Sequence, residues 1–328
     1  MIGAERVMFA DKTALRFLQY SEQQCADLLM QARWPDGFRC PDCGSAAHYR
    51  VSGRRLPLFA CAVCRRQCSL ISGTVMERSR VPLRKWFTAI ALISCHPISA
   101  VALAGQIRVT YKTAWLMLHK LRSAMSSHEE RDRLTGLVRL ELGMCGNQMP
   151  PLPRKLDDRG HPFVIGGSME GGPDGRVLAI KLMQDTGGDT YLRKITPQGA
   201  LRFIEKYTDR SSASIDLRTD CLGRTRVFSL LKIAWRIETD IASTHRGVGT
   251  KHLPFYLNEY AYRFNRSGGG QVESWHLFHL AAASGAPTQK QLKNRPVPGR
   301  PDWDTYRDTR RMIAEFKTLA VKLLPLVS

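Results

Sequence analysis

Hydrophobic and polar positions change their period several times along the chain. Apolar residues recur with helical spacing in residues 11–33 and again in residues 80–128. Between them, residues 34–75 are rich in cysteine, glycine, proline and arginine and contain only short strand-like runs. From Leu134 to about Lys181 the pattern alternates as in half-buried strands. The pattern therefore predicts a multidomain chain in which a mixed α/β domain follows a small irregular β segment and helices.

The rest of the pattern predicts more helices after the strands. Residues 197–208 form one helix, with Pro197 in its first turn. The stretch "ASIDLRTD" is then a strand that ends in Asp220, and helices follow to about Tyr262. A loop and a charged amphipathic helix close the chain. We predict an N-terminal helical segment, a cysteine-rich segment, a helical segment, an α/β domain, and a loop with a C-terminal helix, over residues 1–33, 34–79, 80–128, 129–285 and 286–328.

One long apolar stretch could be mistaken for a membrane span. It reads "WFTAIALISCHPISAVALAGQI" and carries no charged residue, but His96 and Pro97 divide it. Proline lacks the backbone N–H and clashes with the preceding helical turn, so each half is shorter than the roughly 20 residues that a bilayer needs. We predict two short buried helices and no membrane span.

Charge and cysteine content narrow the class of protein. The 328 residues include 49 lysines and arginines against 29 acids, a net charge of +20. Such an excess favours a polyanionic partner, by default nucleic acid, over a protein that is merely basic. The start "MIGAERVMFADKT" carries charges where a secretion signal needs an apolar core. We therefore expect a cytoplasmic, nucleoid-associated protein whose nine cysteines are reduced.

Four cysteines have the spacing of a structural zinc site. Cys40 and Cys43 form one C-x-x-C pair, Cys61 and Cys64 form another, and 17 residues separate the pairs. Each pair predicts a tight turn that points two thiolates at one ion, and two turns complete a closed tetrahedron. The alternative is a redox pair, and Cys68 is a spare ligand that we place on a strand instead. The sequence predicts a zinc ribbon with Zn²⁺ as a structural cofactor.

The predicted ribbon is unusually basic. A cationic ribbon suits contacts to a phosphate backbone, although a solvated charged surface has the same pattern. The residues that we assign to DNA contacts are Arg54, Arg55, Arg65 and Arg66.

The helical segment has the layout of a helix-turn-helix. A short helix opens at residues 97–99, residues 105–109 form the turn, and Thr110 caps a second helix that ends near Met125. Its inward face would contain Ala114, Leu118 and Leu121. A plain helical hairpin remains the alternative interpretation.

If this second helix binds DNA, its first turn would meet base edges and its later cations would meet phosphates. The base-edge candidates are Tyr111, Lys112 and Thr113, and the phosphate candidates are Lys120 and Arg122.

Two motifs carry a family resemblance. The stretches "KTAWLMLHKLRSAM" and "STHRGVGTKHLPFYLNEYAYRFNRS" follow the ribbon in order. In this arrangement the chain resembles the bacterial insertion-sequence transposases with an N-terminal zinc ribbon and a DDE domain, over about residues 25–290. The resemblance implies a ribonuclease H-like core, with acids on its first and fourth strands and on a later helix. It also implies that Mg²⁺ held by these acids assists in cutting and joining DNA.

The resemblance assigns two catalytic acids and leaves the third open. Asp220 matches the acid of the fourth strand, and Glu141 in "VRLEL" stands where the family has an aspartate. Glutamate is longer by a methylene, and Arg139 on the same strand face adds a cation. The family's motif for the third acid is absent, and Glu238 falls where the family has a lysine. Glu238 and Asp240 are the candidates; residues two apart on a helix do not share a face, so at most one is a ligand, and we take Glu238 with Asp240 as the alternative.

The second motif is dense in cations that would contact DNA near the catalytic face, although a charged helix surface is the alternative. The implied partners are double-stranded DNA of the element's terminal repeats and further copies of the chain. An inactive transposase-derived DNA-binding protein is the other hypothesis, and a zinc-ribbon transcription or RNA-processing factor would leave the second motif unexplained. The residues assigned to DNA in this motif are His245, Arg246, Lys251, Arg263, Asn265 and Arg266.

Overall fold

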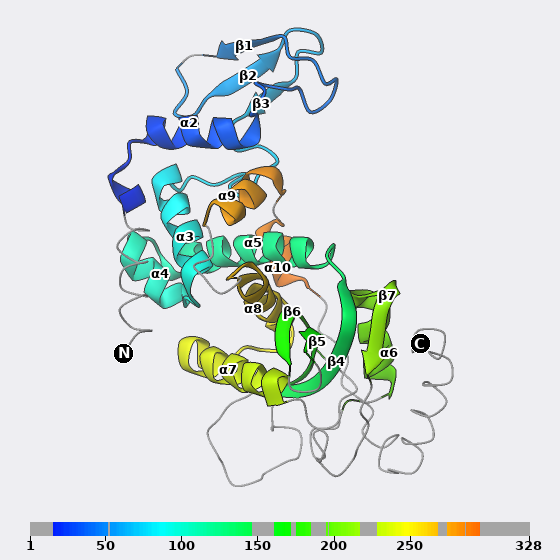
Figure 1. Cartoon of the computed structure of the whole chain (residues 1–328). Coiled ribbons are helices and arrows are strands. Elements are labelled where there is room, and N and C mark those ends of the chain that lie inside the picture. The colour runs from blue at the N-terminus through cyan, green and yellow to red at the C-terminus, as the bar shows by residue number, and fades with distance from the viewer. Residues whose placement is uncertain are drawn as a thin grey trace. The chain divides into compact units, whose positions relative to one another are not determined.

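The structure, a computed structural model, divides the chain into two compact units. Unit 1 comprises residues 1–125 and 271–294, and unit 2 comprises residues 126–270 and 295–328. Figure 1 labels the helices and strands of both units. The structure describes residues 16–51, 53–145, 161–171, 175–184, 195, 197–216, 228–267, 274–285 and 287–295.

Unit 1 begins with two short helical elements rather than the single helix predicted over residues 11–33. A 3₁₀ helix, η1, spans Arg16–Gln19, and the helix α2 spans Glu22–Arg33. Ser21 separates them because its hydroxyl accepts the N–H of Gln24, whose side chain accepts the N–H of Ser21 in return. This reciprocal cap satisfies free donors at the start of α2 and fixes where the helix begins. Residues 11–15 lie outside the described ranges.

A small antiparallel sheet follows α2. Its order is β1-β2-β3, over His48–Val51, Leu58–Cys61 and Gln67–Ser69. Its apolar side is thin: the rings of Phe38 and Phe59 stack with centroids 5.1 Å apart, beside a few buried cysteines. So small a core gives little stability by itself, and segments of this size usually need a metal or disulfides.

The helical part of unit 1 confirms that the apolar stretch is two helices. The first ends at Cys95 and the next begins at Ala100, with His96 and Pro97 between them. None of the described helices is long and apolar enough to cross a bilayer. The helices of this part are α3 (Leu83–Cys95), α4 (Ala100–Ile107), α5 (Tyr111–Glu129, which crosses the unit boundary), α9 (Ser274–Ala283) and α10 (Gln289–Lys293).

A segment distant in sequence completes this helical core. The ring of Phe278 on α9 contacts that of Phe87 on α3 with centroids 4.7 Å apart, and the N–H of Val75 donates to the carbonyl of Ala281. Residues 271–294 therefore belong to unit 1, which corrects the boundary predicted for the 129–285 domain. Sequence distance gave no indication of this pairing, because it is set by packing of apolar faces.

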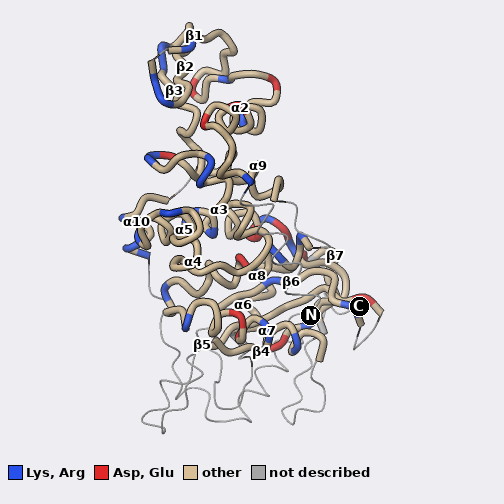
Figure 2. Tube along the Cα trace, turned by 90° about the vertical axis from the view of Figure 1, so that its left-hand side faces the viewer, with Lys and Arg blue, Asp and Glu red and all other residues tan. Residues whose placement is uncertain are grey.

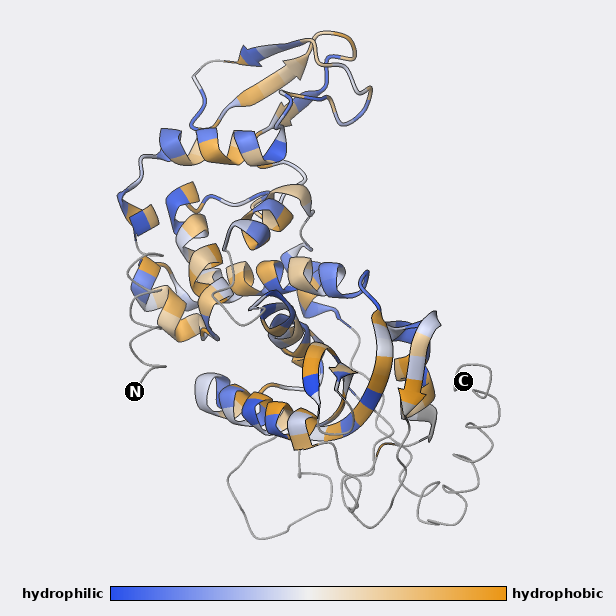
Figure 3. Ribbon diagram, in the orientation of Figure 1, coloured by the Kyte–Doolittle hydropathy of each residue, from blue (hydrophilic) through white to orange (hydrophobic). Residues whose placement is uncertain are grey.

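The sheet of unit 2 has four strands in the order β6-β5-β4-β7. The first three run antiparallel to their neighbours, whereas β7 is parallel to the central strand β4. Figure 3 shows hydrophobic residues along much of β4, in agreement with its burial between two layers. The bounds are Leu134–Cys145 for β4, His161–Glu170 for β5, Arg176–Gln184 for β6 and Thr208–Asp216 for β7.

Helices cover both faces of this sheet (Figure 1). On one face, α6 (Pro197–Tyr207) buries Phe203 against Val138 of β4. On the other, α7 (Phe228–His245) and α8 (Leu253–Ser267) pack through apolar residues such as Leu230 and Leu257. Crossing from β6 to the parallel strand β7 by way of α6 is the expected connection, because parallel strands need a long crossover. The mixed α/β domain predicted from the pattern is confirmed.

Four turns have an unusual backbone. Within the described ranges, every non-glycine residue with positive φ is an exposed arginine. The left-handed conformation brings Cβ close to the following carbonyl, so glycine is the residue that fits it without cost. The four residues are Arg65 (φ 60°), Arg78 (58°), Arg108 (51°) and Arg246 (54°).

Candidate metal centre and nucleic-acid interface

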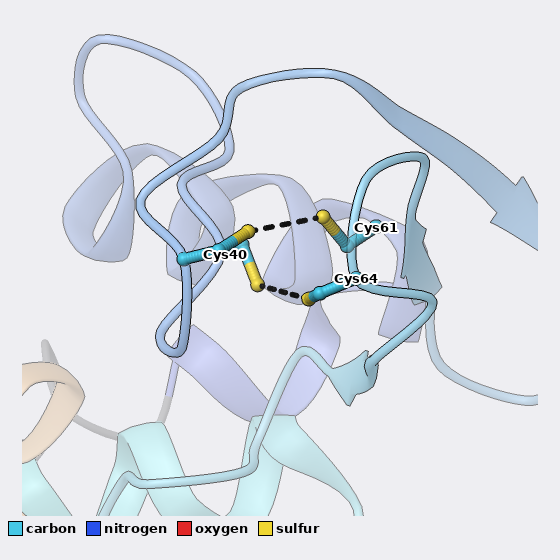
Figure 4. A group of neighbouring side chains, drawn as sticks. Cys40, Cys61 and Cys64 are labelled. Atoms are coloured by element: carbon cyan, nitrogen blue, oxygen red, sulfur yellow. Dashed lines mark hydrogen bonds between the residues drawn. The ribbon is translucent and has the colours of Figure 1, made fainter.

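The four predicted zinc ligands meet at one point of the ribbon. Their sulfur atoms all lie within 4.8 Å of one another. The Sγ atoms of Cys40 and Cys64 are 3.5 Å apart, as are those of Cys43 and Cys61. Figure 4 shows side chains from the two turns directed toward one another. Among the described residues, these cysteines form the one group of three or more potential ligands close enough for a metal ion.

The two cysteine turns have the same hydrogen bonds. In the first, the N–H of Gly44 donates to the carbonyl of Cys40 at 2.9 Å, and in the second, the N–H of Arg65 donates to that of Cys61 at 3.1 Å. The residue after the second cysteine is left-handed in both turns, at Gly44 and at Arg65. This backbone shape turns each pair of thiols toward a common centre.

The arrangement fits zinc in geometry and in charge. A tetrahedral site with Zn–S bonds of about 2.3 Å has sulfur atoms about 3.8 Å apart, close to the separations here. Zinc binds thiolates, and the backbone N–H of Cys64 lowers the pKa of Cys61 to about 6. The N–H groups of Cys43 and Asp42 likewise lower the pKa of Cys40, whereas hydrogen bonds with the neighbouring thiols raise the pKa of Cys43 and Cys64. Four thiolates with no further position make a closed structural site rather than a catalytic one.

Cys68 is correctly left out of the ligand set. It lies on β3, is 2% exposed and packs in the ribbon core. The Nη2 atom of Arg33 on α2 is 3.8 Å from its sulfur, and Nη1 of the same arginine donates to the carbonyl of Leu70 at 2.6 Å. Arg33 thus links α2 to the ribbon.

The ribbon arginines are on the surface, where a phosphate could reach them. Arg54, Arg55, Arg65 and Arg66 are all exposed. Two have protein partners: Arg55 donates to the carbonyl of Arg80 at 3.3 Å, and Arg66 pairs with Asp42 at 2.7 Å. Surface pairs of this kind contribute little stability, so they can be exchanged for another anion. Lysine and arginine positions are frequent along the ribbon in Figure 2.

The predicted helix pair is present, but its turn lies later than expected. Gly105 is inside α4, and the turn consists of residues 108–110. It falls there because Arg108 ends α4 in a left-handed conformation, while the hydroxyl of Thr110 accepts the N–H of Thr113 and so caps α5. In the first turn of α5, Tyr111 is 55% exposed.

The remaining candidates of α5 divide into two groups. Lys112 is exposed and Thr113 is half-buried, in agreement with an accessible first turn. Lys120 and Arg122 are 7% and 1% exposed, which contradicts their assignment to phosphates. The ammonium of Lys120 donates to the carbonyls of Val75 at 3.2 Å and of Glu77 at 2.8 Å. Burial lowers its pKa, and these carbonyls satisfy its donors.

Two of the three predicted catalytic acids lie on facing elements of unit 2. Glu141 is half-buried on the central strand β4. Glu238 lies on α7, and its carboxylate accepts the N–H of Met144 on β4 at 2.6 Å. The charge of Glu238 also contributes, after burial, to raising the pKa of Cys145 at the end of β4. Asp220 lies outside the described residues.

The structure separates the two candidates for the third acid. Asp240 accepts the hydroxyl of Tyr260, and its Oδ2 atom is 3.9 Å from Nε of Arg236. It therefore interacts with α8 and its own helix, whereas Glu238 reaches β4. Arg139, two residues before Glu141 on β4, is only 3% exposed. The cation that the sequence predicts near Glu141 is therefore a buried arginine.

Two residues of the second motif have structural roles instead of the predicted DNA contacts. Asn265 accepts the N–H of Ile180 and donates to its carbonyl, at 2.8 and 2.9 Å, so it pairs with the backbone of β6. Arg263 is 9% exposed, and its Nη1 atom is 3.5 Å from a carboxylate oxygen of Glu259. Arg263 is therefore buried, and the half-buried Asn265 has its amide engaged with the backbone of β6.

The other cations of the second motif are more accessible. Arg246 is exposed directly after α7, and His245 and Lys251 are half-buried. Arg266 is paired with Asp132, with Nη2 and Oδ2 at 3.4 Å. These residues stay candidates for DNA contacts.

A buried ion pair beside Asn265 was not expected from the sequence. Lys181 of β6 and Glu129 at the end of α5 are 2% and 1% exposed, and their charged atoms are 2.7 Å apart. Asn265 donates to the same carboxylate oxygen at 2.9 Å. The pattern could have revealed the lysine, since it stands in the apolar run "VLAIKLM" of a strand.

One family model matches the ribbon. Residues 20–67 match the family described as the transposase zinc-ribbon domain. This match places a transposase zinc ribbon ahead of a helical segment and a mixed-sheet α/β unit.

A relative agrees with this class. The chain is 32% identical, over 148 residues, to a protein of the transposable element ISH50 from Halobacterium salinarum. The aligned residues cover 43% of this chain and 50% of that protein. The chain thus matches about half the length of this relative. The resemblance to insertion-sequence transposases predicted from the motifs is confirmed. No solved structure was found to match the chain.

Proposed function

We propose that this chain is the transposase of an insertion sequence, which binds the DNA of the element's ends and cuts and joins phosphodiesters with Mg²⁺. The observation that carries the proposal is the contact between Glu238 of α7 and the backbone of β4, the strand that bears Glu141. The contact ties the helix that bears Glu238 to the strand that bears Glu141, at Met144, three residues beyond that acid; the family resemblance implies acids on a strand and on a later helix. Assembly of copies on terminal repeats, in the nucleoid, is part of the same proposal.

The sheet supports a ribonuclease H-like core. Such a core has three antiparallel strands and a fourth strand parallel to the first, and the order β6-β5-β4-β7 with β7 parallel to β4 has this form. The central position of β4 puts Glu141 in the middle of the sheet. Asp220 follows β7 by four residues in the sequence, and we assign it to the same centre.

The described acids suit a hard divalent cation. Carboxylate oxygens are preferred ligands of Mg²⁺, and Glu141 and Glu238 are both half-buried, where an ion would be partly desolvated. Bound there, Mg²⁺ would activate the attacking oxygen and stabilise the leaving oxygen. The protein's part is to hold the carboxylates: β4 fixes Glu141, and the N–H of Met144 orients Glu238.

Loss of the strand carboxylate tests this assignment. Glu141→Gln removes a ligand charge and should lower strand transfer on DNA that flanks the gene by at least about a hundredfold, because phosphoryl transfer depends on exact positioning. The measurement is Mg²⁺-dependent joining of a labelled duplex. Glu205→Gln on the exposed side of α6 is the matched control and should leave the rate unchanged.

Equal rates in Glu141→Gln and the unaltered chain would refute the assignment. If even the unaltered chain joins no DNA but binds it, the inactive DNA-binding alternative would replace the proposal.

DNA binding should depend on the ribbon cations. In a variant with Arg54, Arg55 and Arg65 changed to glutamine, the slope of log affinity against log salt should fall by about 0.9 for each phosphate that the ribbon no longer neutralises. Fluorescence anisotropy of a labelled duplex at several salt concentrations gives this slope. Lys290→Gln, an exposed cation of α10, should leave it unchanged. An unaltered slope in the triple variant would show that the ribbon does not contact phosphates.

A further inference from the structure

The outer side of α7 has an unusual composition. Its inner side is apolar and packs on the sheet, as expected of an amphipathic helix. On the opposite side, Phe228 is 58% exposed and Trp235 is 47% exposed, and Lys232 and Arg236 are exposed beside them. Along α7 these four residues follow one another at intervals of four, three and one positions, which places them all on one face of the helix. Two large rings thus alternate with two cations on a surface that faces solvent.

An open groove of about 540 Å³ begins at the same end of the helix. It is lined by Phe228, Lys232 and Ile233 of α7, by Arg176 and Val177 at the start of β6, and by Phe264 of α8. Its volume is in the range of small-ligand sites, about 300 to 1,000 Å³. Two aromatic rings and two cations therefore surround one hollow.

The charges around this surface favour an anion. Arg176 and Lys232 stand at the groove, and Arg236 continues the row along α7. Asp240, one turn after Arg236 on α7, accepts the hydroxyl of Tyr260, and its Oδ2 atom is 3.9 Å from Nε of Arg236, whose side chain remains 79% exposed. Glu170 is opposite Arg176 across the β5–β6 ladder and is the acid that most directly opposes the positive charge.

We propose that Phe228 and Trp235 of α7, with Lys232, Arg236 and Arg176, bind single-stranded DNA. Unpaired bases stack on the rings, and their phosphates meet the cations. A duplex cannot use the rings, because its bases are already stacked on one another. The inference rests on the proposed function in that the unpaired strand belongs to the DNA that the chain processes.

A matched pair of tryptophans tests the proposal. Trp235 is 47% exposed in unit 2, and Trp275 is 49% exposed on α9 of unit 1. Trp235→Ala should weaken binding of the full chain to a labelled 20-nucleotide oligothymidylate by about tenfold, the effect expected when one base no longer stacks on a ring. Trp275→Ala should leave it unchanged, and neither variant should alter binding to a 20-base-pair duplex by more than about twofold. Thermal unfolding of both variants checks that they are folded.

The other outcomes are distinguishable. Unchanged oligothymidylate affinity in both Trp235→Ala and Phe228→Ala would overturn the proposal. Binding of duplex but no oligothymidylate by the unaltered chain would also overturn it and leave the proposed function intact, whereas binding of neither would overturn the proposed function. If Trp235→Ala abolishes self-association in sedimentation without changing oligothymidylate binding, the surface is an interface between copies and the proposal is wrong.

Discussion

Replacement of Cys61 by serine should release the zinc of the ribbon and unfold residues 34–79. Four thiolates at one point hold this segment, and its apolar core is small. The free energy of binding structural zinc, about 10 to 16 kcal/mol in isolated zinc fingers, is therefore largely folding free energy. Elemental analysis should find about one zinc per chain before the substitution and far less after it, and the chelated wild-type chain should resemble the variant.

Cys68→Ser is the matched control, because Cys68 is a buried cysteine of the same small sheet that stands outside the group of four. It should keep its zinc even if its stability falls. Full zinc occupancy in Cys61→Ser, or a folded ribbon in the metal-free chain by near-ultraviolet circular dichroism, would contradict the structural role of the site.

Lys181→Met should lower the free energy of unfolding of unit 2 by about 3 to 5 kcal/mol, because it leaves a buried carboxylate without its partner. Glu129 would keep only Asn265 as a partner among the contacts described above. Burial already raises the pKa of Glu129 in the intact protein, so in the variant this group should become neutral more readily. Urea unfolding followed by circular dichroism measures the loss.

Lys206→Met gives the comparison. Lys206 pairs with Glu130 at 3.1 Å, but both side chains are about half exposed, at 48% and 50%. An exposed pair contributes at most about 1 kcal/mol, so this variant should lose little. Equal losses of unfolding free energy in Lys181→Met and Lys206→Met would contradict this prediction. The ion pair between Lys181 and Glu129 would then not stabilise the contact between β6 and the end of α5.

The features that sequence predicted well are local ones. The zinc site follows from two pairs of cysteines, since each turn is closed by hydrogen bonds between residues close in the chain, such as that from Gly44 to Cys40. The cap at Thr110 is likewise formed with a residue three positions away. The strands of unit 2 are also apparent in the sequence, as runs of mostly apolar residues, because helices cover both faces of the sheet.

Sequence failed where burial depends on distant segments. Lys120 looks like a surface cation in a basic chain, and only the fold shows it beside the carbonyls of Val75 and Glu77. Arg263 is buried as well, although the carboxylate beside it belongs to Glu259 on the same helix. The pairing of α9 with α3 and the reach of Glu238 to β4 also join residues that are far apart in the chain. Charge and spacing alone cannot distinguish a solvent-exposed cation from a buried one that forms hydrogen bonds to a second element.

The left-handed arginines have an evolutionary consequence. At Arg65, Arg78, Arg108 and Arg246 a mutation to glycine would relieve a conformational cost of about 1 to 2 kcal/mol per residue. Selection for stability alone would therefore replace these arginines with glycine. A related chain that carries glycine at these positions should be at least as stable. At these four positions an exposed positive charge coincides with a backbone conformation that glycine adopts without cost.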